Sequence, residues 1–310
     1  MIKVLDPGLF TTVQDLGRFG FGIYGVPQSG AVDDFAYMLG NILVGNFENE
    51  AALEFTQYPG AYQFTSEATI CLAGADFHYR INNSDIKILH TYHVRPGDIL
   101  TGRYPDKGLR GYLCVRGGID VPVVMGSRST YVRGRFGGFM GRKLEKGDLL
   151  KIGNKKNVVM ANLSLRPEIM SYVESSAAGV IVINEIESRF LFDCEYLVSA
   201  QSDRMGIRLT TESPPVTGVM DIVTEPTPVG TIQITSSGLP IVLMNDCQTT
   251  GGYKIAGYVA PTELKILAQK VPGDRITFYP MSIEEAKKRL EERRSFFDSL
   301  KLIARSVYED

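Results

Sequence analysis

Apolar residues in this chain fall mostly into short runs that end at Gly, Pro, Asn or Asp. Runs of roughly four to eight apolar and β-branched residues between such breakers are typical of β-strands. The pattern predicts strands in "TICLAG" (69–74), "IKILHTYHV" (86–94), "GYLCVRGG" (111–118), "GVIVIN" (179–184), "TIQIT" (231–235) and "PIVLM" (240–244). A chain with this many short, separated strands is expected to be mainly β.

Three turn signals of similar sequence separate these runs: "RPGDIL" (95–100), "EKGDLL" (145–150) and "VPGDRI" (271–276). Glycine at the third position provides the positive φ that a tight turn needs, and the following aspartate can bond to nearby backbone. The first two signals then lead into an apolar pair. The recurrence predicts similar hairpin corners, and it suggests two related halves.

Residues 29–45 depart from the strand pattern because their apolar positions recur at helical spacing. These positions are Phe35, Met38, Leu39, Ile42 and Leu43. Ser29 can cap the start of this predicted helix, and Asp33 suits its first turn. Gly45 suits its end.

A second helix is predicted over residues 282–305, where Ser282 and Glu285 form a capping box. Its charges are mixed, and its apolar stripe runs through Ile283, Ala286 and Leu290. This composition indicates a solvated helix, and a basic helix for nucleic acid is the weaker alternative.

Residues 155–179 form the best candidate for a linker, because they hold a proline, a Ser/Ala/Gly cluster and no sustained periodicity. A boundary near residue 165 is expected. Residues 1–165 would then form a first β-barrel subdomain with the glycine-rich loop and the first helix. Residues 166–310 would form a second β-barrel subdomain with the C-terminal helix.

The length of 310 residues is enough for about two domains. The hydrophobic content of 44% and the charged content of 22% are ordinary for a globular protein. A net charge of −2 does not indicate binding to nucleic acid or to an anionic membrane. No apolar run approaches the length of a membrane span, and the N-terminus lacks the apolar stretch of a signal peptide, so we expect the cytoplasm.

The four cysteines, Cys71, Cys114, Cys194 and Cys247, are far apart and form no C-x-x-C motif. This spacing favours reduced, mostly buried thiols over disulfides or zinc ligands. Cys247 stands out, because polar residues surround it in "NDCQTTGGY".

The segment "GFGIYG" (20–25) matches G-x-G-x-x-G, the fingerprint of dinucleotide-binding proteins. That fingerprint needs a strand that ends at the first glycine and a helix that begins at the third. Here "QDLGRF" precedes it and Pro27 follows it, so we reject a dinucleotide site. No P-loop motif occurs in the sequence either, so any ATP is held in neither of these familiar ways by this chain.

The glycines of residues 17–30 allow close approach of the backbone, and several polar residues are interleaved with them or flank them. These polar residues are Gln14, Asp15, Arg18 and Ser29. Two interpretations stay open: the loop lines a cleft, or it is a tight loop that closes one end of a barrel.

Three further stretches concentrate polar side chains among glycines, namely residues 116–131, 202–209 and 240–253. In the last of them, an apolar strand ends abruptly in a polar, glycine-rich loop. Such strand ends are common places for functional groups, because the strand is rigid and the loop is adaptable.

Arginines in these stretches could bind a carboxylate or phosphate through a planar guanidinium, and they are Arg116, Arg128 and Arg204. Asp246 could act as a base or orient a water molecule. The alternative for each is structural, because Arg–Asp pairs and hydroxyl-capped turns often hold loops together.

His90 and His93 lie in the predicted strand 86–94, where they would point to opposite faces and could not share a metal ion. His78 stands alone in the sequence. We therefore expect no metal site and no Ser-His-Asp triad.

Several long motifs occur in a fixed order: "TTVQDLGRFGFGIYGVPQSGAVD", "GADF", "GGIDVPVVMGSRSTY", "GRKLEKGD", "SDRMGIRL", "GTIQI", "PIVLMNDCQTTGGY" and "VPGDRITF". In these motifs the chain resembles the family of the 5-oxoprolinase C subunit, also called allophanate hydrolase subunit 2 or the Kip-type carboxyltransferase domain. The resemblance runs from about Val4 to Phe278, which is nearly the whole chain.

The resemblance implies two cyclophilin-like β-barrel subdomains with a few helices. It implies that the chain acts with the A subunit of that enzyme, together with a Kip-inhibitor-like B subunit, in the ATP-dependent opening of 5-oxoproline to L-glutamate. The chain alone would be inactive, and ATP with Mg²⁺ would be held in the complex, not by this chain alone. A homo-oligomer is a further possibility.

Two other functions occur among proteins of this type and stay open. One is carboxyl transfer in a urea-carboxylase or allophanate-hydrolase system, although the chain lacks the Met-Lys-Met motif and is expected to carry no biotin. The other is a binding protein that antagonises a kinase inhibitor.

Within this family, Asp246 is the expected catalytic residue, and Arg128 or Arg204 is the expected clamp for a substrate carboxylate. The expected substrate- or interface-binding residues are Gln14, Asp15, Arg18, Ser29, Arg116, Ser127, Arg128, Ser129, Arg204, Gln248, Thr249 and Tyr253. Cys247 stands where the family usually has an arginine, so any contact of that arginine with an anion would be missing here.

Overall fold

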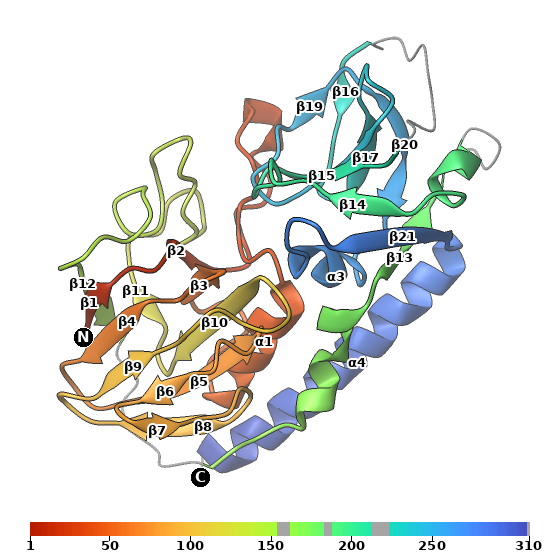
Figure 1. The fold of residues 1–310 in the computed structure, drawn as a ribbon. Helices are drawn as coiled ribbons and strands as arrows, with labels where there is room; N and C mark the ends of the chain where they lie inside the picture. Colours follow the sequence, from red (N-terminus) through yellow and green to blue (C-terminus); the bar gives the residue numbers. More distant parts are fainter. Residues whose placement is uncertain (154–161, 183–187, 213–222, 309–310) are drawn as a thin grey trace. The chain divides into compact units, whose positions relative to one another are not determined.

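The computed structural model describes residues 1–153, 162–182, 188–212 and 223–308 (Figure 1). The first part of the expected linker therefore lies outside the described residues. The chain divides into two compact units. Unit 1 consists of Met1–Arg18, Ser29–Val173 and Phe296–Asp310, and unit 2 consists of Phe19–Gln28 and Glu174–Ser295.

Three segments differ from the division at residue 165 that the sequence indicates. Residues 19–28 belong to unit 2, residues 296–310 belong to unit 1 although they end the chain, and residues 166–173 also belong to unit 1. Aromatic packing explains the second assignment, because the ring of Phe297 lies 5.3 Å from the ring of Phe35 in unit 1, centroid to centroid.

Unit 1 is built on two sheets, and neighbouring strands in both are antiparallel. The first has the order β11-β12-β1-β4-β9-β6-β7. Its strands are β1 (Ile2–Asp6), β4 (Ala61–Phe64), β6 (Arg80–Ile81), β7 (Ser84–Asp85), β9 (Ile99–Thr101), β11 (Ile119–Asp120) and β12 (Leu149–Ile152). The second, of order β2-β3-β10-β5-β8, consists of β2 (Phe10–Gln14), β3 (Ala52–Thr56), β5 (Ala68–Gly74), β8 (Thr91–Val94) and β10 (Arg110–Val115).

The core of unit 1 forms where α1 (Asp34–Leu43) contacts the central strands β5 and β10 (Figure 1). Every residue of both strands is buried. Gly40 faces β10 so closely that an added Cβ would lie 2.7 Å from Sγ of Cys114. The absence of a side chain at this position therefore sets how closely helix and sheet approach.

The first helix begins later than its hydrophobic pattern predicts. The expectation that Ser29 caps it is wrong, because Asp33 is the N-cap and its carboxylate accepts a hydrogen bond from N of Ala36 at 3.0 Å. Ser29 instead lies in the left-handed region, with φ of 54°. Gly45 follows the helix with φ of 69°, as its predicted role in ending it requires.

Unit 2 contains a closed barrel with the strand order β13-β20-β17-β18-β15-β14-β21 (Figure 1). Its strands are β13 (Ala177–Ile181), β14 (Tyr196–Val198), β15 (Gly206–Thr210), β17 (Thr231–Ile234), β18 (Pro240–Leu243), β20 (Lys254–Val259) and β21 (Arg275–Pro280). A separate two-stranded sheet pairs β16 (Glu225–Pro226) with β19 (Thr250–Gly251).

The remaining helices are short, apart from the last one. They are η1 (Gly22–Tyr24), η2 (Pro167–Glu174), η3 (Arg189–Leu191), α3 (Leu264–Ala268) and α4 (Ile283–Tyr308). The last confirms the predicted C-terminal helix. N of Glu285 donates to Oγ of Ser282 at 3.1 Å, which is one of the two hydrogen bonds of a capping box, and the Glu285 carboxylate accepts from Nη2 of Arg289 at 2.6 Å.

The three corner sequences adopt one turn geometry, as their recurrence predicts, but they are not hairpins: the first joins β8 to β9, which lie in different sheets, and the third follows α3. Their glycines, Gly97, Gly147 and Gly273, have φ of 97°, 97° and 91°. In each turn, the aspartate carboxylate accepts a hydrogen bond from the backbone N–H at the start of the turn. The pairs are Asp98 with Arg95 at 2.8 Å, Asp148 with Glu145 at 2.8 Å and Asp274 with Val271 at 2.9 Å.

The strand predicted over residues 86–94 is wrong in its first half, because only Thr91–Val94 form β8. Leu89 has φ of 56°, which breaks the extended conformation just before β8. His90 then forms an isolated bridge with Ser164. An apolar run alone could not reveal this left-handed residue.

The chain is mainly β with few helices, as the sequence predicts. The closed barrel lies in unit 2, whereas the strands of unit 1 form the two sheets described above. Among the described residues, no helix is both long enough and apolar enough to cross a membrane.

Candidate functional site

Asp15 follows the last residue of β2 and lies at the centre of a hydrogen-bonded cluster in unit 1. One oxygen of its carboxylate accepts hydrogen bonds from N of Gly17 at 2.8 Å and from Oγ of Ser127 at 2.6 Å. The same oxygen also accepts from Oγ of Ser129. The other oxygen accepts from N of Arg128 at 2.6 Å. Four donors from two distant segments therefore converge on one carboxylate.

Gln14 and Arg18 extend this cluster on either side of Asp15. Oε1 of Gln14 accepts from N of Gly30 at 3.2 Å. The guanidinium of Arg18 lies 4.9 Å from the ring centroid of Phe136 and donates to the backbone oxygen of Ser129. A cation over an aromatic face is attracted to it, most strongly when water is excluded.

The cluster brings together the N-terminal loop and the "GSRSTY" stretch, which the sequence singles out separately. Its predicted site residues are all at most 2% exposed, and they are Gln14, Asp15, Arg18, Ser29, Ser127 and Ser129. In this conformation their polar groups hold the two segments together. A direct role for them in binding a ligand stays a prediction.

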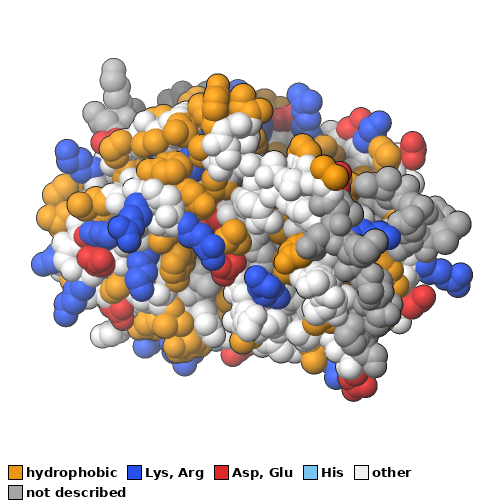
Figure 2. All heavy atoms as spheres, turned by 90° about the horizontal axis from the view of Figure 1, so that it is seen from above, with side chains coloured by type: hydrophobic (Ala, Val, Ile, Leu, Met, Phe, Trp, Pro, Cys, Tyr) orange, Lys and Arg blue, Asp and Glu red, His pale blue; other side chains and the backbone are white. Residues whose placement is uncertain are grey.

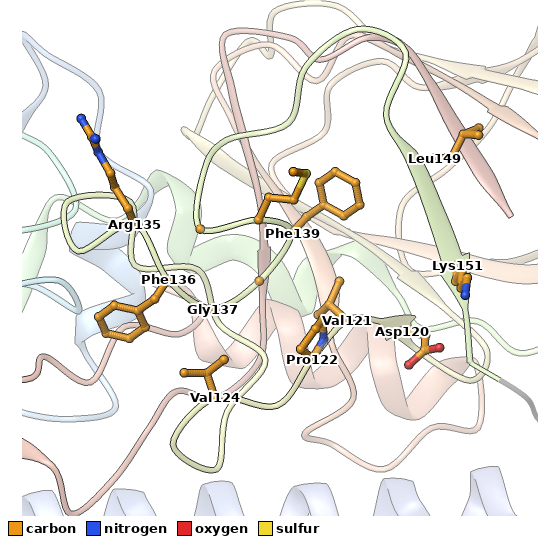
Figure 3. A pocket seen from close by; sticks show the side chains of 13 residues that line it. Asp120, Val121, Pro122, Val124, Arg135, Phe136, Gly137, Phe139, Leu149 and Lys151 are labelled. Carbon is orange, nitrogen blue, oxygen red and sulfur yellow. The ribbon is translucent and has the colours of Figure 1, made fainter.

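A pocket of about 660 Å³ adjoins this cluster (Figure 3). Its lining residues are Asp120, Val121, Pro122, Val124, Arg135, Phe136, Gly137, Gly138, Phe139, Met140, Gly141, Leu149 and Lys151. Most of its wall is apolar. Asp120 and Lys151 lie at one edge of the pocket and Arg135 at the other, so charged groups of both signs stand at its rim (Figure 3).

The loop that forms much of this pocket has an unusual backbone. Arg135 and Met140 have φ of 55° and 58°, which lie in a backbone region that residues other than glycine rarely adopt. Gly137 lies so close to the cluster that an added Cβ would collide with the backbone oxygen of Ser129. Such strained segments occur often at functional sites, where the surrounding structure enforces them.

Hydrophobic side chains also remain exposed in the pocket wall and beside it. Val123, Met125 and Met140 are 56%, 41% and 74% exposed. Figure 2 shows one face of the molecule on which hydrophobic side chains are interspersed with lysine and arginine side chains.

In unit 2, Arg204 and Asp246 form a two-point ion pair. Nε of Arg204 lies 2.9 Å from Oδ2 of Asp246, and Nη2 lies 3.2 Å from Oδ1. The side chains are 8% and 9% exposed. The sequence left open whether these two residues bind substrate or hold loops together, and in this structure they pair with each other. Any role of Asp246 as a base, or of Arg204 as a carboxylate clamp, therefore requires this pair to open.

The second half of the glycine-rich loop reaches the polar end of strand β18 within unit 2. A Cβ added to Gly22 would contact the methyl group of Thr249 at 3.9 Å. Nε2 of Gln248 donates to Oε1 of Gln233 at 3.4 Å. Tyr253 is 38% exposed close by in sequence. Gln248, Thr249 and Tyr253 therefore form the more accessible part of the predicted site.

Cys247 is a buried thiol in the same segment, as the sequence predicts for most of the cysteines. Burial raises its pKa to about 12, and the nearby carboxylate of Asp246 acts in the same direction. Its Sγ lies 4.0 Å from the backbone oxygen of Thr227. The neutral, buried thiol at this position cannot replace a guanidinium as an anion ligand.

Arg116 lies apart from both clusters. Its guanidinium stacks on Tyr308 at 4.2 Å and donates to the backbone oxygen of Val44 at 3.0 Å. It lines a separate pocket of about 550 Å³ in unit 1, together with Lys301 and Arg305. Burial lowers its pKa, and the hydroxyl of Tyr308 opposes that shift.

Among the arginines predicted to bind a carboxylate, Arg128 is the best placed to do so. Its backbone N–H serves Asp15, while Nε donates to the backbone oxygen of Val121 at 3.3 Å. Val121 lines the 660 Å³ pocket. This arrangement leaves the two Nη groups of Arg128 able to bind a carboxylate near the pocket.

Two features of the sites were missed by sequence reasoning. The first is the pocket loop "GRFGGFMG" (134–141), which could have been noticed because it is as rich in glycine as "GFGIYG" (20–25). The second is Gln233, which could have been noticed as a single large polar side chain inside the apolar strand "TIQIT". Neither sequence pattern predicts which residues the loop or Gln233 contacts.

The histidines stand in separate places. His78 lies 3.3 Å from Asp106 and His93 lies 3.9 Å from Glu67, each measured from Nε2 to a carboxylate oxygen. In the part of the chain that the structure describes, no three His, Cys, Asp or Glu side chains gather in a way that could hold a metal ion.

Comparison with known proteins gives a consistent result. A family model described as "Carboxyltransferase domain, subdomain A and B" matches residues 24–280. The 5-oxoprolinase C subunit of Haemophilus influenzae is 33% identical over 307 residues, which cover 98% of each chain. The 5-oxoprolinase C subunit of Escherichia coli is 34% identical over 302 residues, which cover 97% of each chain.

A solved structure supports the same relationship. The urea amidolyase of K. lactis has a TM-score of 0.87 and 29% identity over 96% of this chain, which spans 20% of that much longer chain. The family model, the relatives and the fold therefore agree: the chain belongs to the carboxyltransferase-domain family with subdomains A and B.

Proposed function

We propose that this chain is the C subunit of an ATP-dependent 5-oxoprolinase, which opens 5-oxoproline to L-glutamate together with the A and B subunits. The observation that carries this proposal is the match in length. The two relatives named as C subunits of 5-oxoprolinase align over 97% or more of both chains. The chain spans only 20% of the urea amidolyase that it resembles in fold.

Within this reaction, water adds to the lactam carbonyl carbon, the ring C–N bond breaks, and the nitrogen leaves as the amino group of glutamate. ATP with Mg²⁺, bound in the complex and not by this chain alone, would supply the driving force. The residues of this chain would hold and orient the lactam.

We propose that Arg128, and not Arg204, is the arginine of this chain that binds a carboxylate, at the pocket of unit 1. Nε and Nη2 of Arg204 already donate hydrogen bonds to the carboxylate of Asp246. Arg128 has one hydrogen bond from Nε to Val121, beside the 660 Å³ pocket. A guanidinium can bind a carboxylate through two parallel hydrogen bonds, which fixes position as well as charge.

Asp246 is proposed to orient the attacking water or accept its proton, once its pair with Arg204 opens on assembly with the partner subunits. Before that step, Arg204 would keep the carboxylate from acting. This arrangement predicts that the chain is inactive alone.

Reconstitution tests the function directly. The purified chain alone should release no glutamate from 5-oxoproline, and addition of the A and B subunits with ATP and Mg²⁺ should start release. Omission of either partner, or of ATP, serves as the control. If the full complex releases no glutamate, the proposed function is wrong.

A carboxyltransferase role is the second candidate, because the fold of the urea amidolyase matches over 96% of this chain. Such a role needs a biotin carrier on another chain. Urea-stimulated ATP turnover that avidin inhibits, in a system reconstituted with a biotin carrier, would support this candidate over the first.

A further inference from the structure

Gln233 lies on the outer face of the unit 2 barrel. Residues directly opposite each other on antiparallel strands share a face of the sheet. Gln233 pairs with Ile241, which pairs with Arg208, and Arg208 is exposed. The neighbouring residue Ile232 belongs to the opposite, interior face. A polar side chain on the outer face would normally reach solvent, yet Gln233 is only 1% exposed.

A short cover of backbone buries Gln233. The cover consists of residues 225–227 and 248–251, which include the paired strands β16 and β19 (Figure 1). N of Thr227 donates to the oxygen of Thr249 at 3.0 Å, and Oγ1 of Thr227 donates to the oxygen of Gln248 at 3.0 Å. The side-chain nitrogen of Gln233 reaches Gly251, where an added Cβ would collide with it.

The amide nitrogen of Gln233 is a buried donor with no hydrogen-bond partner among the described residues. Its oxygen Oε1 accepts one hydrogen bond, at 3.4 Å, from Nε2 of Gln248. Buried polar groups are nearly always paired, so a donor without an acceptor needs an explanation. The register of β17 against β20 also shifts between Ile232 and Gln233, and such bulges are frequent beside active sites.

We propose that Gln233 recognises a small amide whose N–H and C=O lie on the same edge, as in a lactam or urea, when the cover lifts. The carboxamide of glutamine presents a donor and an acceptor side by side. Its Nε2 would donate to the ligand C=O, and its Oε1 would accept from the ligand N–H in place of Gln248. The chemical class follows from this donor and acceptor pair, and the choice of 5-oxoproline as natural ligand rests on the proposed function.

The exposed side of the cover fits this role. Gln248 is exposed and would be released when the ligand takes its place on Oε1. Gly251 has no side chain, so the cover can approach Gln233 closely without a ligand. The site would thus be closed when empty and opened by exchange of one weak hydrogen bond for two.

The test uses Gln233→Met in the complex of this chain with the A and B subunits. Methionine keeps the length of the side chain and removes both the donor and the acceptor. Gln201→Met is the matched control, since Gln201 is an exposed glutamine in a turn of the same unit. We expect Gln233→Met to raise the KM for 5-oxoproline by about tenfold or more, and the control to change it by less than about twofold.

Two simpler probes measure recognition without turnover, through ligand-observed NMR. 2-Pyrrolidinone carries the lactam N–H and C=O, whereas γ-butyrolactone has the same ring with oxygen in place of N–H. The wild-type complex should bind the lactam about tenfold more tightly than the lactone, and Gln233→Met should remove this preference. Equal affinity of the wild type for both probes, or binding of neither, would overturn the proposal.

Thermal unfolding separates recognition from a structural role. Because Nε2 of Gln233 has no partner among the described residues, Gln233→Met should leave Tm unchanged or raise it. A lowered Tm with unchanged KM and unchanged probe affinity would show that Gln233 only supports the fold, and this would also overturn the proposal. If the complex does not turn over 5-oxoproline, the proposed function fails, while the two cyclic probes still decide the role of Gln233.

Discussion

At the scale of single residues, several polar side chains of this protein find their partners inside the same unit. Asp15 receives four hydrogen bonds, and Asp246 receives two from Arg204. These contacts explain why so many charged and hydroxyl side chains can be buried beside glycine-rich loops. They also narrow the choice of residues that remain able to contact a ligand, since Gln248 is exposed and Arg128 is half-buried.

Asp15→Ala should strongly destabilise unit 1. The change removes one acceptor and leaves the N–H groups of Gly17 and Arg128 without it. Leaving buried donors unpaired is costly, so we expect the free energy of unfolding to fall by about 3 kcal/mol. Urea denaturation measures this loss.

Asp85→Ala is the matched control for that experiment. Its carboxylate is exposed and pairs at 2.7 Å with Arg80, which is also largely exposed. Exposed pairs contribute little, so the expected change is within about 1 kcal/mol. Similar denaturation midpoints for the Asp15 and Asp85 variants would contradict the central role of Asp15 in the cluster.

At the scale of elements, local signals predicted the structure well where neighbours in sequence make the contacts. The corner turns are examples, because Gly97 and Asp98 form their turn with Arg95. Prediction failed where one residue leaves the regular conformation for a tertiary reason. Leu89 shortened a predicted strand in this way, and its N–H donates to Leu72 at 2.7 Å.

Asp33→Ala should destabilise α1, because Asp33 and not Ser29 caps it. The carboxylate of Asp33 accepts from N of Ala36 at 3.0 Å and from the hydroxyl of Tyr172 at 2.7 Å. Loss of both contacts should lower the free energy of unfolding by about 2 kcal/mol. Asp33→Asn keeps the capping oxygen, so it should recover most of this loss. Equal urea midpoints for the two variants would argue against the cap.

At the scale of the whole molecule, the order of segments along the chain does not match their division between the two compact units. The glycine-rich loop is divided between the units at Arg18 and Phe19, and the last fifteen residues belong to unit 1. A single boundary drawn along the chain could not express this arrangement. The reason is that membership depends on side-chain packing, and hydrophobic side chains far apart in sequence can pack in one core.

Phe297→Ala should therefore weaken unit 1, although Phe297 lies near the end of the chain. The side chain is 2% exposed and packs against Phe35. Truncation of a buried phenylalanine costs about 3–5 kcal/mol. Hydrogen exchange should become faster in β5 and β10, with smaller changes in β17. Ile303→Ala, at a 57% exposed position of the same helix, is the control and should have little effect.

The candidate sites were predictable as stretches of sequence and less so as sets of contacts. The motifs around Asp15, Ser127 and Asp246 marked segments that the structure places in two clusters. The partner of each residue was not predictable, and neither was the burial of Gln233. Spacing along a chain reports local periodicity, whereas a barrel brings together strands whose separation in sequence varies.

The sequence by itself determined the mainly β character, the corner turns and the two long helices, because these depend on interactions between residues near one another in the chain. Its motifs also determined the family. Only the tertiary structure decided that Asp15 bonds to Ser127, 112 residues away, and that Arg204 neutralises Asp246, 42 residues away. It alone decided that Gln233 lies under the cover, because such contacts arise from strand order and packing, which no local pattern specifies.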